Sequence, residues 1–115
     1  MEFYLTNLCP RLRINMSKFR CCNNKLPSND FRFIGNDLAK ICKLCNLKEI
    51  GDEYHYLFRC TYFTQERTLY LKKYFSQRPN TLKMNKLFNT RNKKELRNLA
   101  RFQTIIIETF KCLGN

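Results

Sequence analysis

Glycine, histidine and paired acidic residues are scarce in this sequence, and each scarcity argues against a class of enzyme. Three glycines and one histidine leave no glycine-rich phosphate loop and no Ser-His-Asp set. The only adjacent acids, Asp52 and Glu53, suit the start of a helix better than a two-metal site. We therefore expect no enzymatic activity and no small-molecule substrate.

Long apolar runs are missing as well. The longest, around Ile105 to Ile107, is far too short to span a bilayer. The N-terminal residues lack the basic stretch and long apolar core of a secretory signal. The seven cysteines are an odd number, which does not favour a disulfide scaffold. These features predict a soluble protein of a reducing intracellular compartment, nucleus or cytoplasm, with no membrane partner.

Positive charge is what the chain has in excess. Its 22 Lys and Arg residues against 9 Asp and Glu give a formal net charge of +13. Such an excess attracts polyanions, so RNA or DNA is the first partner to consider, although basic residues also cover ordinary solvated surfaces. The ten Phe and six Tyr residues indicate a folded chain, and 115 residues are enough for one small core.

Apolar residues recur at three- and four-residue steps through much of the chain, which predicts helices. The clearest is the last, where Asn92 and Glu95 form a capping pattern and one face is apolar. Asp52, Thr61 and Thr81 are candidate caps for earlier helices. We expect helices near residues 10–22, from Glu53 onward, from Tyr62 to Phe75, from Thr81 to Asn89 with Leu82, Leu87 and Phe88 facing inward, and from Asn92 to a stop at Gly114.

One short window contains a pattern typical of a metal site. Cys42 and Cys45 form a Cys-x2-Cys pair, and the sole histidine, His55, is followed by Cys60. Zn²⁺ prefers four tetrahedral sulfur and nitrogen ligands, and the His-x4-Cys spacing lets both side chains face one point from the start of a helix. We expect one structural zinc ion here, with all four positions filled by protein. Gly51 is suited to a left-handed turn beside the site.

Two other interpretations of these cysteines remain open. A Cys-x-x-Cys pair also occurs as a redox pair, and buried cysteine and histidine are often only packing residues. The other four cysteines, Cys9, Cys21, Cys22 and Cys112, are interpreted as small packing residues.

The segments ICKLC at 41–45 and GDEYHYLFRC at 51–60, with MSKFRCCNNKLP at 16–27, resemble a known family. It is the zinc-binding domain found downstream of the reverse transcriptase in non-LTR retrotransposons. The resemblance extends more loosely to LKKYF at 71–75 and NKKELRNLARF at 92–102, so it covers most of the chain. It implies that Cys42, Cys45, His55 and Cys60 are the zinc ligands and that the domain helps to hold template RNA or target DNA.

These observations combine into one expectation for the fold and the function. We expect a single, mainly α-helical domain built around one structural CCHC zinc site, with the return from Asn46 to Ile50 suited to a short hairpin. Residues 1–40 supply a helix and loop leading into the site, and residues 41–115 supply the site and the C-terminal helices. The densest basic region is the expected nucleic-acid surface: Lys83, Lys86, Arg91, Lys93, Lys94, Arg97 and Arg101. The alternatives are a zinc-stabilised protein-interaction module and a functionless retroelement remnant.

Overall fold

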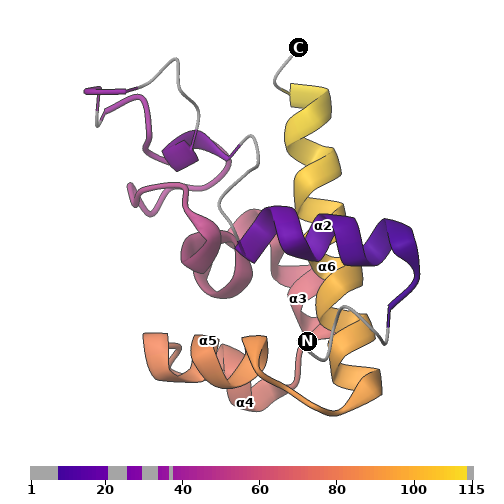
Figure 1. The fold of residues 1–115 in the computed structure, drawn as a ribbon. Helices are drawn as coiled ribbons and strands as arrows, with labels where there is room; N and C mark the ends of the chain where they lie inside the picture. The colour runs from indigo at the N-terminus through magenta and orange to yellow at the C-terminus, as the bar shows by residue number, and fades with distance from the viewer. Residues whose placement is uncertain (1–7, 21–25, 30–33, 37, 114–115) are drawn as a thin grey trace.

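The C-terminal helix α6 (Lys93–Leu113) is the axis of the structure, and α2, α3 and the turn around His55 pack against it (Figure 1). The structure is a computed structural model that describes residues 8–20, 26–29, 34–36 and 38–113. Asn92 caps α6, because its Oδ1 accepts hydrogen bonds from the backbone N–H groups of Lys94 and Glu95 at 2.9 and 3.1 Å. The predicted apolar face is confirmed, since its members are all buried: Leu96, Leu99, Ala100, Gln103, Ile106, Ile107 and Phe110.

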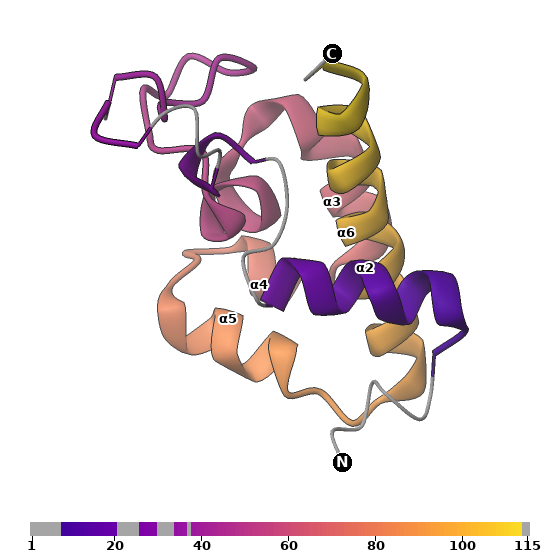
Figure 2. The same cartoon turned by 45° about the horizontal axis from the view of Figure 1, so that its top comes forward.

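Helix α2 (Pro10–Arg20) crosses α6 in both views (Figures 1 and 2). Its proline occupies the first helical position, where the missing N–H costs no hydrogen bond. Met16 and Phe19 are buried, and Asn15 Nδ2 donates a hydrogen bond to Thr104 Oγ1 on α6 at 3.1 Å. The predicted helix over 10–22 therefore begins as expected and extends to Arg20, while positions 21 and 22 lie outside the described residues.

The helix predicted from Tyr62 to Phe75 is broken into three pieces. The 3₁₀ turn η4 (Thr61–Phe63) leads into α3 (Thr64–Tyr70), and α4 (Lys73–Ser76) follows after a step. Leu71 forms that step with extended backbone, φ −109° and ψ 143°. Leu71 itself and Phe75 on α4 are both buried, so tertiary packing overrides the local helical pattern.

Three further details of the predicted helices are wrong. Thr61 forms no side-chain cap; only its carbonyl is used, as acceptor for the Thr64 hydroxyl at 2.9 Å. Helix α5 (Thr81–Phe88) is capped by Asn80 rather than Thr81, because Asn80 Oδ1 accepts the N–H of Lys83 at 2.8 Å. Leu87 is buried as expected, but Leu82 is 64% exposed.

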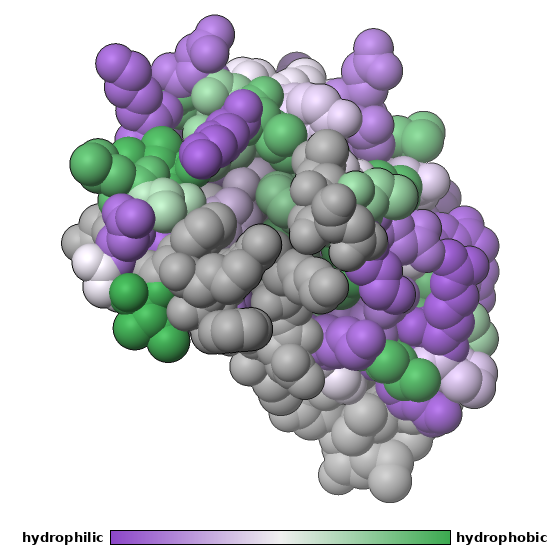
Figure 3. Space-filling view, turned by 90° about the horizontal axis from the view of Figure 1, so that it is seen from above, coloured by the Kyte–Doolittle hydropathy of each residue, from purple (hydrophilic) through white to green (hydrophobic). Residues whose placement is uncertain are grey.

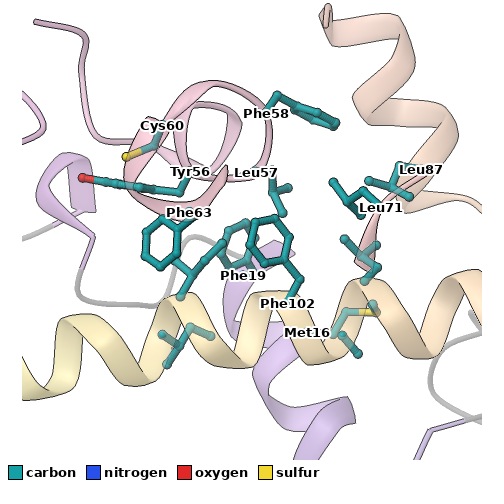
Figure 4. Close-up of a cluster of buried hydrophobic side chains, with 14 of the residues drawn as sticks. Met16, Phe19, Tyr56, Leu57, Phe58, Cys60, Phe63, Leu71, Leu87 and Phe102 are labelled. Carbon is teal, nitrogen blue, oxygen red and sulfur yellow. The ribbon is translucent and has the colours of Figure 1, made fainter. Parts of the chain in front are cut away.

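Aromatic side chains connect the segment around His55 to α6. Tyr56 is fully buried and packs edge-on against Phe63 and Phe110, with ring centroids 6.0 and 4.8 Å apart. Phe63 in turn meets Phe102 of α6 at 6.3 Å (Figure 4). Edge-to-face pairs of this kind add to the free energy gained from burial alone. The packing fixes the segment that carries His55 and Cys60 against the longest helix.

The predicted fold class is confirmed: the domain is small and mainly helical, and no β-strand occurs in the described ranges. The expected hairpin is reduced to a single antiparallel bridge between Ile41 and Ile50. Within the same ranges, no helix combines the length and the apolar character needed to cross a membrane.

Candidate metal centre

The structure brings the side chains of Cys42, Cys45, His55 and Cys60 together. Their ligand atoms all lie within 4.8 Å of one another. The Cys42 sulfur lies 3.8 Å from the sulfurs of both Cys45 and Cys60, and the Cys45 sulfur lies 3.4 Å from His55 Nε2. Four soft donors around one point form a site that could hold a single metal ion. No other such group of three or more Cys, His, Asp or Glu side chains is found in the described part of the chain.

The Cys42–Cys45 turn is held by backbone hydrogen bonds on both sides. Cys42 N–H donates to the carbonyl of Glu49 at 2.8 Å, and Gly51 N–H donates to that of Lys40 at 2.8 Å. Leu44 N–H points to the Cys42 sulfur at 3.3 Å. The turn thus presents two sulfurs on one side before any metal is considered.

The left-handed residue of this turn is not the one predicted. Lys48 has φ 57°, whereas Gly51 is not among the residues with positive φ. Gly51 is needed for space instead, because a Cβ atom there would lie 2.4 Å from the Tyr56 hydroxyl oxygen. Glycine at this position therefore permits a close approach rather than a special backbone conformation.

His55 and Cys60 are aligned by a π-helical turn, η3 (His55–Arg59). Cys60 N–H donates to the carbonyl of His55 at 2.8 Å, the i to i+5 bond that defines this geometry. In an α-helix, side chains five residues apart point about 140° away from each other. The wider π turn brings them to the same side. The predicted cap is confirmed, since Asp52 Oδ1 accepts the N–H of His55 at 2.8 Å.

Glu49 and Arg59 support the histidine from outside the cluster. Glu49 Oε1 lies 3.0 Å from His55 Nδ1, and Arg59 Nε donates to both Glu49 oxygens at 2.7 and 2.8 Å. A carboxylate on Nδ1 holds the proton there and leaves Nε2 directed at the sulfurs. Burial lowers the pKa of His55, against the opposing effect of Glu49, so the imidazole is neutral as a metal ligand must be.

Of the three cysteines in the cluster, Cys42 and Cys60 are buried and Cys45 is half-buried. Burial is also the main reason why the pKa of Cys60 is raised to about 12, although the Tyr62 N–H opposes it. The Tyr56 hydroxyl is buried without a well-formed hydrogen bond, and burial and the neighbouring Cys42 sulfur raise its pKa (Figure 4). A metal-bound Cys42 thiolate would give this hydroxyl an acceptor. The orphaned hydroxyl therefore fits a cluster that carries negative charge.

A buried arginine interacts electrostatically with one of the cluster cysteines, Cys60. Arg67 is only 6% exposed and donates to the carbonyls of Leu57 and Tyr56 at 2.7 and 3.0 Å. Burial lowers the pKa of Arg67, and the negative groups that oppose this are Cys60 and Glu66. An uncompensated buried cation is costly, so a negatively charged cluster nearby would stabilise it.

The predicted nucleic-acid residues lie on α5, α6 and the link between them. Six of the seven are exposed: Lys86, Arg91, Lys93, Lys94, Arg97 and Arg101. Lys83 is half-buried and has a structural contact, because its Nζ donates to the carbonyls of Tyr74 and Gln77 at 2.9 and 2.5 Å. Lys93, Arg97 and Arg101 follow at four-residue steps, so they form one stripe along α6.

Several features of the site were not predicted from the sequence. Glu49, Arg59, Tyr56 and Arg67 were not identified; an acidic residue six positions before the histidine is too weak a signal. Cys9 and Cys112 are exposed free thiols, so their interpretation as packing residues is wrong. Cys21 and Cys22 lie outside the described residues.

Large apolar side chains are exposed on the loop that leads into the metal cluster. They are Ile34, Leu38, Leu47 and Ile50, which are between 41 and 80% exposed. Seen from above, hydrophobic residues gather on the left, the side where Figure 1 places this loop (Figure 3).

No family model matches the chain, and no curated protein or solved structure matches it either. The site is therefore interpreted from its own geometry. The likeness of residues 41–60 to the retrotransposon zinc domain stays a prediction from the residues that carry it.

Proposed function

We propose that this chain is a non-catalytic zinc-binding domain, derived from a retrotransposon reverse transcriptase polyprotein, that contacts RNA or DNA through the basic surface of α5 and α6. The observation that carries the zinc assignment is the spacing of the four ligand atoms. Zn–S bonds of about 2.3 Å and Zn–N bonds of about 2.0 Å at tetrahedral angles put the sulfurs about 3.8 Å apart and a sulfur and nitrogen about 3.5 Å apart. Three of the six observed separations match these values, at 3.8, 3.8 and 3.4 Å, and all six lie within 4.8 Å.

The composition of the site supports a structural ion rather than a catalytic one. Three cysteines and one histidine fill a tetrahedral shell, which leaves no position for a water or substrate. Zn²⁺ with three thiolates has a net charge of −1, and buried Arg67 beside Cys60 would balance it. The residues around this site would then serve only to fix the four ligands in place around the ion.

The nucleic-acid assignment depends on charge and on the stripe of α6. The net charge of +13 falls by only one when three thiolates bind Zn²⁺, so the polyanion attraction persists. Lys93, Arg97 and Arg101 are exposed along one line, as contacts with successive phosphates require. The same resemblance that names the zinc ligands also implies this partner.

Salt titration of binding tests the assignment. We expect the fluorescence anisotropy of labelled RNA and DNA to report binding that weakens steeply with salt, with a slope of about −0.7 to −0.9 per phosphate contact on a log–log plot. Replacing Arg97 and Arg101 by Gln should remove about two phosphate contacts and make the slope less negative by the corresponding amount. The matched control, Lys43→Gln with Lys48→Gln on the metal loop, removes the same charge and should leave most of the slope. Salt-independent or absent binding would contradict the proposal.

The exposed apolar loop favours a second candidate function, a zinc-stabilised protein-interaction module. Ile34 and Leu38 are 77 and 80% exposed, and exposed apolar surface often marks a protein-interaction site. This candidate predicts no nucleic-acid affinity and a partner that protects the loop from proteolysis. The salt titration therefore separates the two.

A further inference from the structure

A pocket lies between the end of α3, helices α4 and α5, and the first turns of α6. Its volume is about 390 Å³, within the range of small-ligand sites. Its apolar part is formed by Leu71, Phe75 and Leu87, which are 6, 7 and 1% exposed. Tyr70, half-buried at the end of α3, adds an aromatic side chain to the lining.

The polar part of the pocket comes from the start of α6 and from Lys72. Lys72 is ion-paired with Glu95, and Glu95 also accepts a hydrogen bond from the Thr90 hydroxyl at 2.7 Å. The charged groups of Lys72 and Glu95 therefore already have partners within the protein. Asn98, half-buried one turn further, lines the pocket, and its side-chain amide has no hydrogen-bond partner in the described part of the chain. Lys94 lines the same pocket from an exposed position.

The apolar lining together with the Asn98 amide and Lys94 indicates which kind of ligand the pocket would bind. An aliphatic side chain would fill the apolar part but leave the Asn98 amide unpaired, at a cost in binding free energy. A planar base with donors and acceptors on its edge can contact Tyr70 and Phe75 with its face and Asn98 with its edge. The phosphate attached to that base would then lie near Lys94. Base-paired nucleotides cannot enter, because their edges are occupied and their stack would have to open.

We propose that this pocket binds one unpaired nucleobase together with its phosphate, as a single-stranded stretch of RNA or DNA would present it. The inference rests on the proposed nucleic-acid function and deepens it, because Lys94 belongs to the basic residues already assigned to that function. It adds a preference for single strands, which the charge of the α6 stripe alone does not provide.

Mononucleotides test the pocket independently of longer nucleic acids. In a ¹⁵N-HSQC titration of the zinc-loaded chain with AMP and UMP, we expect the amide signals of Leu71, Phe75 and Asn98 to shift. Ribose 5-phosphate, which lacks a base, is the control and should leave these signals in place. Equal shifts with ribose 5-phosphate, or no shift with either nucleotide, would overturn the proposal.

Two matched pairs of variants test the same pocket with oligonucleotides. Lys94→Gln should weaken single-strand binding more than Lys93→Gln, whereas duplex binding should fall equally in both. Tyr70→Leu should weaken single-strand binding about fivefold or more by loss of stacking, and Tyr62→Leu, an exposed tyrosine elsewhere, should not. Zinc content and circular dichroism establish that each variant folds. If duplex and single strand bind alike and neither pair differs, the pocket proposal fails while the proposed function stands.

Discussion

The loop that carries the cysteine pair and the helices that pack on α6 are stabilised in different ways. Residues 38–52 contribute one buried apolar side chain, Cys42, and leave Leu38, Leu47 and Ile50 exposed. The helices contribute most of the core, including Phe19, Phe63, Phe102 and Ile106. A segment that buries so little apolar surface cannot offset its loss of conformational entropy by packing. A metal ion held by the cluster would stabilise the loop in the way that the hydrophobic core stabilises the helices.

Removing the metal should have the largest effect on stability, and it should affect residues 38–52 more than α6. With a chelator in excess, we expect residues 38–52 to lose amide protection in hydrogen exchange, because a structural zinc site contributes roughly 10 kcal/mol or more to folding. Amides in the middle of α6 should keep part of theirs. The control is the chelator pre-loaded with zinc. Equal loss of protection in both regions would show that they form one cooperative unit.

Phe102→Ala should destabilise the helices by removing a large side chain from their hydrophobic core. Phe102 of α6 is fully buried against the aromatic cluster, so its truncation should lower the free energy of unfolding by about 3–5 kcal/mol. Leu82→Ala, on the exposed side of α5, should change it by less than about 0.5 kcal/mol. Urea unfolding in the presence of zinc measures both. Equal, small losses would mean that the helices depend on the metal as well.

Glu49→Gln sharpens the account of the metal region. The amide is neutral and a weaker hydrogen-bond acceptor than the carboxylate, so the variant should hold His55 less firmly and lower zinc affinity by about 10- to 100-fold. Competition with a chromophoric chelator measures this affinity. Glu108→Gln, an acidic residue paired with Arg11 far along α6, is the control and should bind zinc like the wild type. An unchanged affinity for Glu49→Gln would exclude the Glu49 contact as a support of the site.

Gly51→Ala tests the contact between the two regions. The added Cβ would lie 2.4 Å from the Tyr56 hydroxyl oxygen, and the forced shift should cost about 1–3 kcal/mol in unfolding free energy. Tyr56→Phe removes that oxygen, so Gly51→Ala should be milder in the Tyr56→Phe background. The double-mutant cycle is measured by thermal unfolding with zinc present. Additive effects would contradict the close approach as the reason for glycine.

The sequence predicted those parts of the molecule that follow from local pattern. The apolar face of α6, its Asn92 cap and the Asp52 cap before His55 are all present, because each depends on residues within a few positions. The convergence of the cysteines and the histidine was predicted from spacing alone, since metal coordination limits how such residues can be arranged.

What the sequence did not predict depends on contacts between distant residues. The extended step at Leu71 interrupts a good helical pattern, and it is stabilised by burial that no local window contains. The π turn at His55–Arg59 has the same origin, because an α-helix is the default unless tertiary contacts or a ligand require the wider turn. The burial of Arg67 was not predicted either, because it depends on the carbonyls of Leu57 and Tyr56 that the π turn presents.

The central claim is that one zinc ion, held by Cys42, Cys45, His55 and Cys60, completes the fold. Native mass spectrometry of the wild type and of His55→Ala tests it most directly, with circular dichroism before and after a chelator. The account predicts one zinc per wild-type chain, and both the metal and part of the helical signal lost in the variant. A wild-type chain that is folded and metal-free would contradict it, and the four side chains would then be packing residues.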